Sequence, residues 1–287
     1  MKNTQQKDEK LFQIDVEKVI RNQSNKTVRN LPGPVVSFIK WLIKEKEMNA
    51  ILQRIGHKKN FDFVEAAIKE LDLKIRIYGA ENIPDDPNVI FVGNHALGGV
   101  DFFALAYAIK DKFTSINHLT NDVLMSIKPL SDIMVPVNVF GKNPVEYQRL
   151  YDERLKDPTK PVTIFPSGEV ARTHHGEWDD GVWRSGFVRF AKKFNKTVVP
   201  FFITTRNSPW FYRIERWRRK LGIKANLELF LLPRQIFYQK GKTIEIFFGK
   251  PISPETFDET KSIHEWADYV KKIAYSLPEE IHKKSGE

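Results

Sequence analysis

Apolar residues recur along the chain in short segments whose spacing distinguishes two kinds of element. Six β-rich runs are bounded by polar or turn-forming stretches, which is typical of strands. The expected strands span residues 73–78, 88–92, 162–165, 197–204, 227–232 and 243–248. Apolar residues at helical spacing predict helices at 35–43, 60–71, 102–109, 183–194 and 268–277.

The order of these elements indicates a fold class. Strands that alternate with helices favour an α/β fold, in which helices cover both faces of one sheet. We therefore expect a mixed central sheet flanked by helices. The helices expected at 35–43 and 60–71 precede the first strand and predict an N-terminal helical arm. The chain is thus expected to divide into an arm at 1–72 and an α/β domain at 73–287.

Composition limits the class of protein. Of the 287 residues, 41% are hydrophobic and 12% are aromatic, which excludes disorder for most of the chain. The chain has no cysteine, so a disulfide scaffold, a thiolate zinc site and a cysteine nucleophile are all excluded. No segment has the ~20 mostly apolar residues that a membrane-spanning helix needs. The N-terminus also lacks the apolar stretch of a signal peptide.

The chain is basic, with 46 Lys and Arg against 36 Asp and Glu and a net charge of +10. Residues 1–60 carry 13 basic and 6 acidic side chains, which is most of the excess. A second basic stretch, 206–224, mixes seven Lys or Arg with Trp, Phe and Tyr. This pattern suits lipid head groups or nucleic acid. No RNA-recognition signature, zinc knuckle or helix-turn-helix supports a nucleic-acid-binding module, which stays as a non-enzymatic alternative.

The loop after the second expected strand holds the first candidate chemistry. His95 follows the strand pattern, and Asp101 lies at the start of a helical pattern, with Gly98 and Gly99 between them. If the glycines fold the loop back, the Asp101 carboxylate reaches His95 Nδ1 and leaves Nε2 free as a base. The backbone N–H groups of Gly98 and Gly99 would form an anion site. The structural alternative is that Asp101 is a helix N-cap and His95 an ordinary polar group.

A second polar segment follows the strand expected at 162–165. It begins with Phe165-Pro166-Ser167-Gly168, a turn-forming sequence, and continues to Glu169 and Arg172. Ligands of open α/β sheets usually bind at this end of the strands. The Arg172 guanidinium can hold a phosphate or a carboxylate through paired donors. The alternative is an ordinary turn followed by a surface ion pair.

Two other kinds of site fit the sequence poorly. His174 and His175 are adjacent, and no further His or acidic residue has a usual ligand spacing, so we expect no metal site. Ser167 lies in Pro-Ser-Gly-Glu rather than in Gly-x-Ser-x-Gly, which argues against a serine hydrolase.

Taken in order, these motifs resemble those of the glycerolipid acyltransferases, the enzymes related to lysophosphatidic acid acyltransferase. The resemblance rests on Asn94-His95 with Asp101, on Phe165-Pro166-x-Gly168, and on Val198-Val199-Pro200. It is strongest with a bacterial subgroup that has five residues between His and Asp. The resemblance covers about residues 70–255, with further subgroup-like sequence at 206–208, 220–226 and 248–252.

The resemblance implies roles for the residues that match its motifs. His95 is the general base, Asp101 is its orienting partner, and Phe165, Pro166, Ser167 and Gly168 hold the acyl acceptor. The full set of expected substrate-binding residues adds Asn94, Gly98, Gly99, Lys142, Glu169 and Arg172.

Three positions differ from the common pattern of the family. Four residues usually separate the His from the Asp, whereas five do so here. Ser167 replaces the usual Glu of the third motif, and it is open whether Glu169 compensates. The second motif usually supplies an Arg for the acceptor phosphate, and here it has only Lys142. The acceptor is therefore open between lysophosphatidic acid and a lyso-aminolipid of the ornithine- or glycine-lipid kind.

The expected reaction is acyl transfer from a thioester to the hydroxyl of a lyso-lipid. His95 removes the hydroxyl proton, and backbone N–H groups near Gly98–Gly99 or Gly168 stabilise the tetrahedral oxyanion. A lysophospholipase or thioesterase that activates water with the same pair is the alternative enzyme.

No cofactor is expected. The expected partners are a lyso-lipid, acyl-CoA or acyl carrier protein, and an anionic membrane surface, with no nucleic acid. We expect a monotopic protein at the cytoplasmic face of the membrane, without a transmembrane helix, held by residues 35–43 and 210–220.

Overall fold

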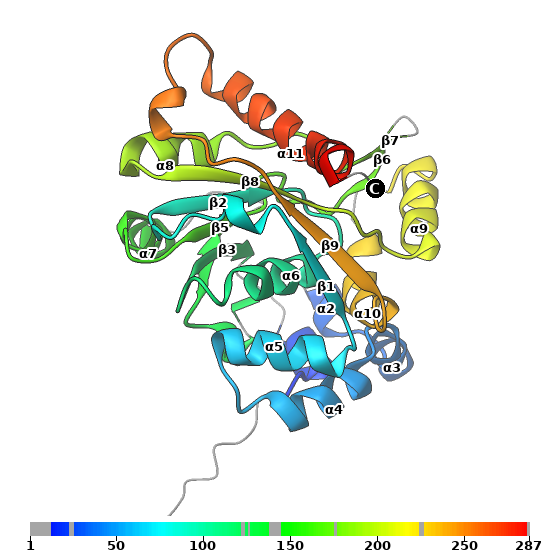
Figure 1. The fold of residues 1–287 in the computed structure, drawn as a ribbon. Helices are drawn as coiled ribbons and strands as arrows, with labels where there is room; N and C mark the ends of the chain where they lie inside the picture. Colours follow the sequence, from blue (N-terminus) through cyan, green and yellow to red (C-terminus); the bar gives the residue numbers. More distant parts are fainter. Residues whose placement is uncertain are drawn as a thin grey trace, which may run out of the picture.

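A mixed sheet forms the centre of the computed structural model (Figure 1), which describes residues 13–22, 26–121, 124–125, 127–137, 145–174, 177–223 and 227–285. Its strands are β1 (Lys74–Tyr78), β2 (Val89–Gly93), β3 (Asn117–Asn121), β4 (Met134–Val137), β5 (Val162–Ile164), β8 (Thr197–Ile203) and β9 (Thr243–Phe248). Their order is β1-β9-β8-β2-β5-β3-β4. Neighbouring strands are parallel except β8 and β9, which pair antiparallel. The expected mixed sheet is confirmed.

Helices and short connecting elements surround this sheet. The helices after β1 are α6 (Gly99–Ile109), α7 (Val145–Lys156), α8 (Gly186–Phe194), α9 (Pro209–Lys220), α10 (Leu232–Tyr238) and α11 (Ile263–Ser285). The short 3-10 helices are η1 (Ala80–Asn82), η3 (Lys128–Leu130), η4 (Leu227–Leu231) and η5 (Pro254–Thr256). A small antiparallel hairpin consists of β6 (Arg172–His174) and β7 (Glu177–Asp179).

Helices cover both faces of the sheet because alternate strand residues point to opposite sides. On β2, Val89 and Phe91 pack into a core shared with α6, whereas Ile90 and Val92 pack into a core shared with α8 and α11. All four side chains are buried. An apolar residue at every position is typical of a parallel strand that is covered on both faces.

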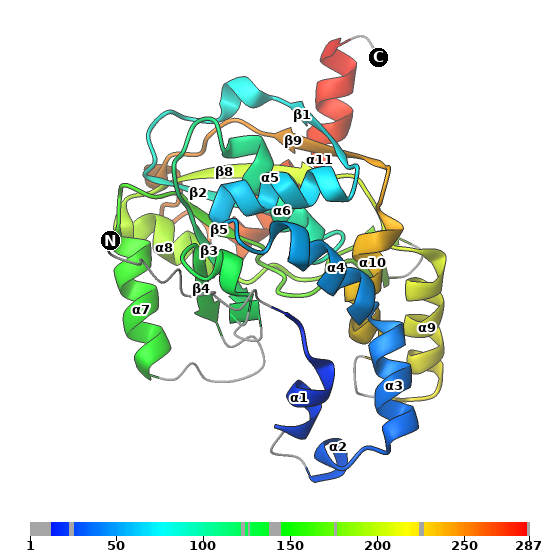
Figure 2. The same cartoon turned by 90° about the horizontal axis from the view of Figure 1, so that it is seen from below.

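The N-terminal segment has more helices than its sequence pattern predicts. Its described part forms α1 (Val16–Arg21), α2 (Lys26–Arg29), α3 (Gly33–Leu42), α4 (Glu45–Ile55) and α5 (Asn60–Glu70). Figure 2 shows α1 and α2 away from the sheet, and α3 next to α9 and α10. Leu52, Ile55 and Val64 of α4 and α5 belong to the same core as the sheet, so this core continues across the expected boundary at residue 72.

Two expectations about elements differ from the structure. Residues 227–232, for which the apolar run predicts a strand, are helical in η4 and α10. The period of so short an apolar run does not separate strand from helix. Pro233 fits the first turn of α10, but it would remove a hydrogen-bond donor from a strand. Conversely, β3 has the mostly polar sequence Asn-His-Leu-Thr-Asn, which does not indicate a strand.

Across the described ranges, no helix is both long and apolar enough to cross a bilayer.

Candidate active site

His95 and Asp101 lie side by side at the carboxyl end of β2. Nδ1 of His95 is 2.9 Å from Oδ2 of Asp101. The same carboxylate oxygen accepts hydrogen bonds from the backbone N–H groups of Leu97, at 2.8 Å, and Gly98, at 3.0 Å. The Asp101 side chain is fully buried, whereas that of His95 is 20% exposed. The carboxylate therefore fixes both the loop and the imidazole, and Nε2 is the ring nitrogen that does not face Asp101.

The glycine at the start of α6 makes this loop possible. Gly98 is the N-cap residue and Asp101 is the third residue of the helix, so Asp101 is not the cap itself. Gly98 has φ = +94°, a backbone conformation that residues with a Cβ rarely adopt. The tight turn directs the Gly98 N–H group to the Asp101 carboxylate.

Two of the expected oxyanion donors are already used within the protein. The Gly98 N–H donates to Asp101, and the Gly168 N–H donates to the Phe165 carbonyl at 3.1 Å, because each lies in a tight turn. Gly99 differs, since it is exposed and begins α6, where N–H groups have no acceptor within the helix. A Cβ on Gly99 would meet no atom within 4 Å, so the space beside it is open.

Phe165 forms an apolar wall beside His95. The two rings are stacked, with centroids 4.6 Å apart and planes inclined by 18°. Phe165 also forms a T-shaped contact with His118 of β3, with ring centroids 5.6 Å apart. Nδ1 of His118 is 2.7 Å from the Thr163 hydroxyl. Burial, together with the nearby His95, lowers the pKa of His118 to about 3, so this histidine is neutral near pH 7.

The main chain of His95 is held on both sides. Its N–H donates to Oδ2 of Asp180 at 3.0 Å, and its carbonyl accepts from the Ala171 N–H at 2.7 Å. Asp180 is buried and also accepts hydrogen bonds from the Tyr275 hydroxyl, at 2.7 Å, and the Trp183 indole. Burial raises the pKa of the Asp180 carboxyl. No local motif indicates that Asp180 supports the loop, because Asp180 is 85 positions from His95 and 95 positions from Tyr275 in the chain.

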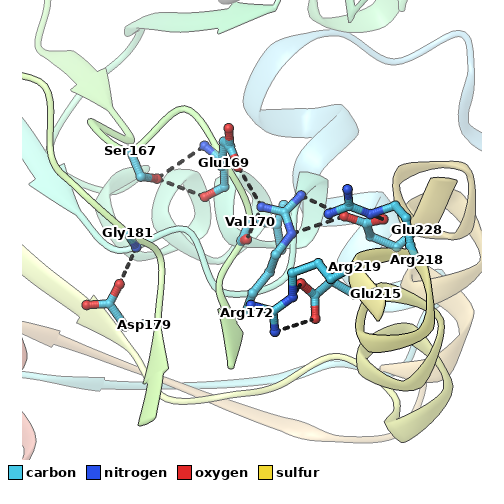
Figure 3. Close-up of polar contacts among 10 residues, drawn as sticks. All are labelled: Ser167, Glu169, Val170, Arg172, Asp179, Gly181, Glu215, Arg218, Arg219 and Glu228. Carbon is cyan, nitrogen blue, oxygen red and sulfur yellow. Dashed lines mark hydrogen bonds and ion pairs between the residues drawn. The ribbon is translucent and has the colours of Figure 1, made fainter. Parts of the chain in front are cut away.

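Arg172 is buried and lies in a cluster of ion pairs (Figure 3). Its Nη1 is 2.6 Å from Glu169, and its Nε and Nη2 are 3.1 and 3.0 Å from Oε1 of Glu228. Glu228 is fully buried and also pairs with Arg218 of α9 at 2.8 Å. The Arg172 guanidinium, which the sequence presents as a clamp for a phosphate or carboxylate, is thus bonded to two carboxylates of the protein itself.

Other expected substrate-binding residues have internal partners. The Asn94 side chain is buried, and both of its polar atoms bond to the backbone of Ile203, at 2.8 and 2.9 Å. It therefore joins the ends of β2 and β8. The Ser167 hydroxyl donates to the Glu169 carbonyl at 2.8 Å, and the Pro166 carbonyl accepts from the backbone N–H of Arg184.

Some expected residues fall outside the described part of the chain. Lys142 and His175 are not among the described residues, and the same holds for the side chain of His174.

The family is decided by comparison with known proteins. A family model described as "Acyltransferase" matches residues 18–283. The chain belongs to the acyltransferase family. The resemblance that its motifs indicate is therefore confirmed, and the protein is an acyltransferase.

Relatives of this acyltransferase include two proteins named lyso-glycine lipid O-acyltransferase. The protein from Bacteroides thetaiotaomicron is 34% identical over 271 residues, which are 94% of this chain and 99% of the relative. The protein from Phocaeicola vulgatus is 33% identical over 271 residues, with 94% and 97% covered. Among solved structures, the 1-acyl-sn-glycerophosphate acyltransferase PlsC of Thermotoga maritima is 18% identical with a TM-score of 0.48, covering 86% of this chain and 87% of that one.

Proposed function

We propose that this acyltransferase moves a fatty acyl group from an acyl thioester to the hydroxyl of a lyso-lipid, with His95 as the general base. The observation that carries this proposal is the 2.9 Å contact between His95 Nδ1 and the buried Asp101 carboxylate. A carboxylate at Nδ1 stabilises the tautomer in which Nε2 carries no proton. That nitrogen can then accept the proton of an attacking hydroxyl.

The reaction needs no covalent intermediate on the enzyme. The acceptor oxygen attacks the carbonyl carbon of the thioester while Nε2 of His95 takes the hydroxyl proton. The C–S bond of the tetrahedral intermediate then breaks, and His95 returns the proton to the leaving thiolate. Asp101 stabilises the imidazolium that exists between the two steps. The products are the new ester and the free thiol of coenzyme A or acyl carrier protein.

We assign the stabilisation of the tetrahedral oxyanion to the start of α6. The Gly99 N–H lies next to the catalytic loop, and the space beside this glycine is open. The partial positive charge of a helix N-terminus adds to the effect of a single N–H donor. Such donors are typically worth about 10²–10³ in kcat for acyl-transfer reactions.

For the acceptor we propose a lyso-glycine lipid, with lysophosphatidic acid as the alternative. The charge of Arg172 is already compensated by Glu169 and Glu228, at 2.6 and 3.0 Å. A phosphate monoester carries about −1.5 to −2 charges at pH 7 and calls for more positive charge than a carboxylate does. The names of the two bacterial relatives agree with an acceptor of the glycine-lipid class.

One assay tests this function against the hydrolase alternative. The purified protein is supplied with acyl-CoA or acyl carrier protein thioester, with and without lyso-glycine lipid, and products are measured by mass spectrometry. We expect diacylated glycine lipid with the acceptor and little free fatty acid without it. Free fatty acid formed at full rate without the acceptor would identify a thioesterase. Turnover with lysophosphatidic acid but not with lyso-glycine lipid would identify lysophosphatidic acid as the acceptor.

We further propose that the protein works as a monotopic enzyme on the cytoplasmic face of the membrane. Phe38 and Trp41 of α3 are 57% and 61% exposed, and Trp210 and Trp217 of α9 are 61% and 59% exposed. These two helices are neighbours (Figure 2), and α9 ends in Arg218-Arg219-Lys220. Exposed aromatic residues beside basic ones are typical of helices that bind an anionic bilayer surface.

A further inference from the structure

A groove of about 510 Å³ opens between α3, α9 and α10. Its volume falls in the range of about 300–1,000 Å³ that is typical of ligand sites. Figure 2 shows these three helices side by side, with α3 contributed by the N-terminal segment. Apolar side chains from these helices and from the end of η4 line the groove, among them Trp41, Leu42, Trp210, Ile214, Leu231 and Phe237.

Both charged side chains that line the groove are basic. Lys44 lies with its Nζ 5.0 Å from the ring centre of Phe237, and the Arg234 guanidinium lies 4.8 Å from that of Trp41. No carboxylate lines the groove within the described residues. Outside the groove, however, Glu47 pairs with the Lys44 ammonium at 3.0 Å, so the charge of Lys44 is already compensated. The groove therefore suits a mainly apolar molecule such as a lipid chain, and Arg234 can lie beside a negative group at its edge.

The inner wall of the groove adjoins the catalytic loop. Leu231 lines the groove and packs in one cluster with Val170, which lies two residues before Arg172. The next residue, Leu232, reaches within 3.4 Å of the position that a Cβ on Gly98 would occupy. One layer of side chains thus separates the groove from the loop that holds His95.

A second contact joins the groove to the same loop from α9. Ser208 lines the groove, and its backbone N–H donates to Gln235 at 2.8 Å. The preceding residue, Asn207, donates from its side chain to the Ala96 carbonyl at 3.3 Å. The loop and two of the helices that form the groove are therefore fastened together by direct hydrogen bonds.

We propose that this groove holds the acyl chain of the lipid acceptor and so directs its hydroxyl toward His95. The proposal rests on the function proposed above, since it assigns a subsite to the same acceptor. A lyso-lipid must take its chain out of the bilayer to react, and a groove with apolar walls replaces the lost apolar surroundings. The exposed rings of Trp41 and Trp210 line the groove and lie on the face proposed to meet the membrane.

Filling the groove tests the proposal. Ile214→Trp places a large ring in the groove from α9, whereas Leu221→Trp makes a similar change at an exposed position just past the same helix, outside the groove. Both variants and the wild type are assayed with lyso-glycine lipids that share a head group and differ in chain length. For acceptors that are dissolved in water as monomers, we expect wild-type kcat/KM to rise by up to roughly fourfold for each methylene that enters the groove. We expect Ile214→Trp to raise KM for the long-chain acceptor about tenfold or more, with the short-chain KM and kcat unchanged, and Leu221→Trp to match the wild type.

Several outcomes would overturn the proposal. If Ile214→Trp leaves the dependence of kcat/KM on chain length unaltered, the chain lies elsewhere. The same conclusion holds if Ile214→Trp loses vesicle binding but keeps that dependence. Photo-crosslinking with a lyso-glycine lipid that carries a diazirine at the chain end gives a readout without turnover. Labelling of α9 or α10 peptides, lost in Ile214→Trp, supports the groove even if the acceptor assay fails. Labelling confined to other segments contradicts it, and wild-type enzyme without any acyl transfer contradicts the proposed function instead.

Discussion

At the scale of single residues, the site depends on which main-chain groups are already used and which are free. Oδ2 of Asp101 accepts a hydrogen bond from the Gly98 N–H, so this N–H cannot bind an oxyanion. Gly99, the next residue, begins the helix and faces open space. The sequence predicts the His95–Asp101 pair because both residues lie in one short loop. It does not predict which of two adjacent glycines keeps a free N–H, since the turn angle at Gly98 decides this.

The role of Gly99 can be tested with a substitution that removes its backbone N–H group. Proline is well accepted at the first position of a helix and has no N–H, so Gly99→Pro should keep α6 and delete the proposed oxyanion donor. We expect kcat for acyl transfer to fall about 10²–10³-fold with little change in KM. Gly99→Ala keeps the N–H and meets no neighbour, so it serves as the control and should retain turnover. Equal activity of the two variants would contradict the assignment.

The buried histidine beneath the site predicts a dependence of stability on pH. The pKa of His118 is about 3 in the folded protein and about 6.5 when unfolded. As the pH falls below 6.5, the unfolded chain binds a proton that the folded chain does not bind until about pH 3, so folding stability is lost through this window. Between pH 7 and pH 5, His118 should account for a loss of about 2 kcal/mol in the free energy of unfolding.

Urea unfolding at both pH values measures this loss. His118→Gln should reduce the difference between pH 7 and pH 5 by about that amount, because glutamine does not titrate. His264 is exposed on α11, so His264→Gln should leave the difference as it is in the wild type. An unchanged pH dependence in His118→Gln would show that other groups cause the acid sensitivity.

At the scale of elements, the ion pairs around Glu228 connect three segments that are far apart in the sequence. Arg172 belongs to β6, Glu228 to η4 and Arg218 to α9, and the two arginines meet on one fully buried carboxylate (Figure 3). In the sequence, Glu169 lies three positions before Arg172, which suggests a surface ion pair. Glu228 lies in a segment whose apolar run predicts a strand, so the sequence does not show that it pairs with Arg172.

Loss of the Glu228 charge should destabilise the protein. Glu228→Gln leaves Arg172 and Arg218 largely buried without their shared carboxylate, which typically costs about 3–5 kcal/mol. Glu169 is 48% exposed, so Glu169→Gln should cost less than about 1 kcal/mol. Denaturant unfolding of the two variants compares these costs directly. Similar stabilities for both would mean that the buried cluster contributes no more than a surface ion pair.

At the scale of the whole molecule, the order of strands and helices in the sequence is enough to predict the mixed sheet and its two helical layers. The strand expected at 243–248 coincides with β9, because Ile244 and Ile246 alternate with Thr243 and Glu245, which is the period of a strand. The position of α3 against α9 and α10 could not be predicted, since contacts between segments so distant in the chain leave no local pattern. That contact creates both the groove and the exposed aromatic face.

The exposed aromatic face predicts binding to vesicles. Phe38 and Trp217 are exposed on α3 and α9 and do not line the groove. Replacing both with Ser should weaken binding to anionic vesicles several-fold, and raised salt should weaken the binding of the wild type. Tyr269 is exposed on α11, away from this face, so Tyr269→Ser is the control. Sedimentation with vesicles measures the bound fraction, and equal binding of all three proteins would exclude this face as the membrane contact.

In the proposed mechanism, His95, oriented by Asp101, takes the proton of the acceptor hydroxyl. The steady-state rate of acyl transfer from an acyl thioester to lyso-glycine lipid, compared between the wild type and His95→Ala, tests this role. A general base typically contributes about 10²–10⁴-fold, so we expect a loss of that size with the same circular dichroism spectrum and urea midpoint. A folded His95→Ala enzyme that keeps more than about a tenth of the wild-type rate would contradict the account.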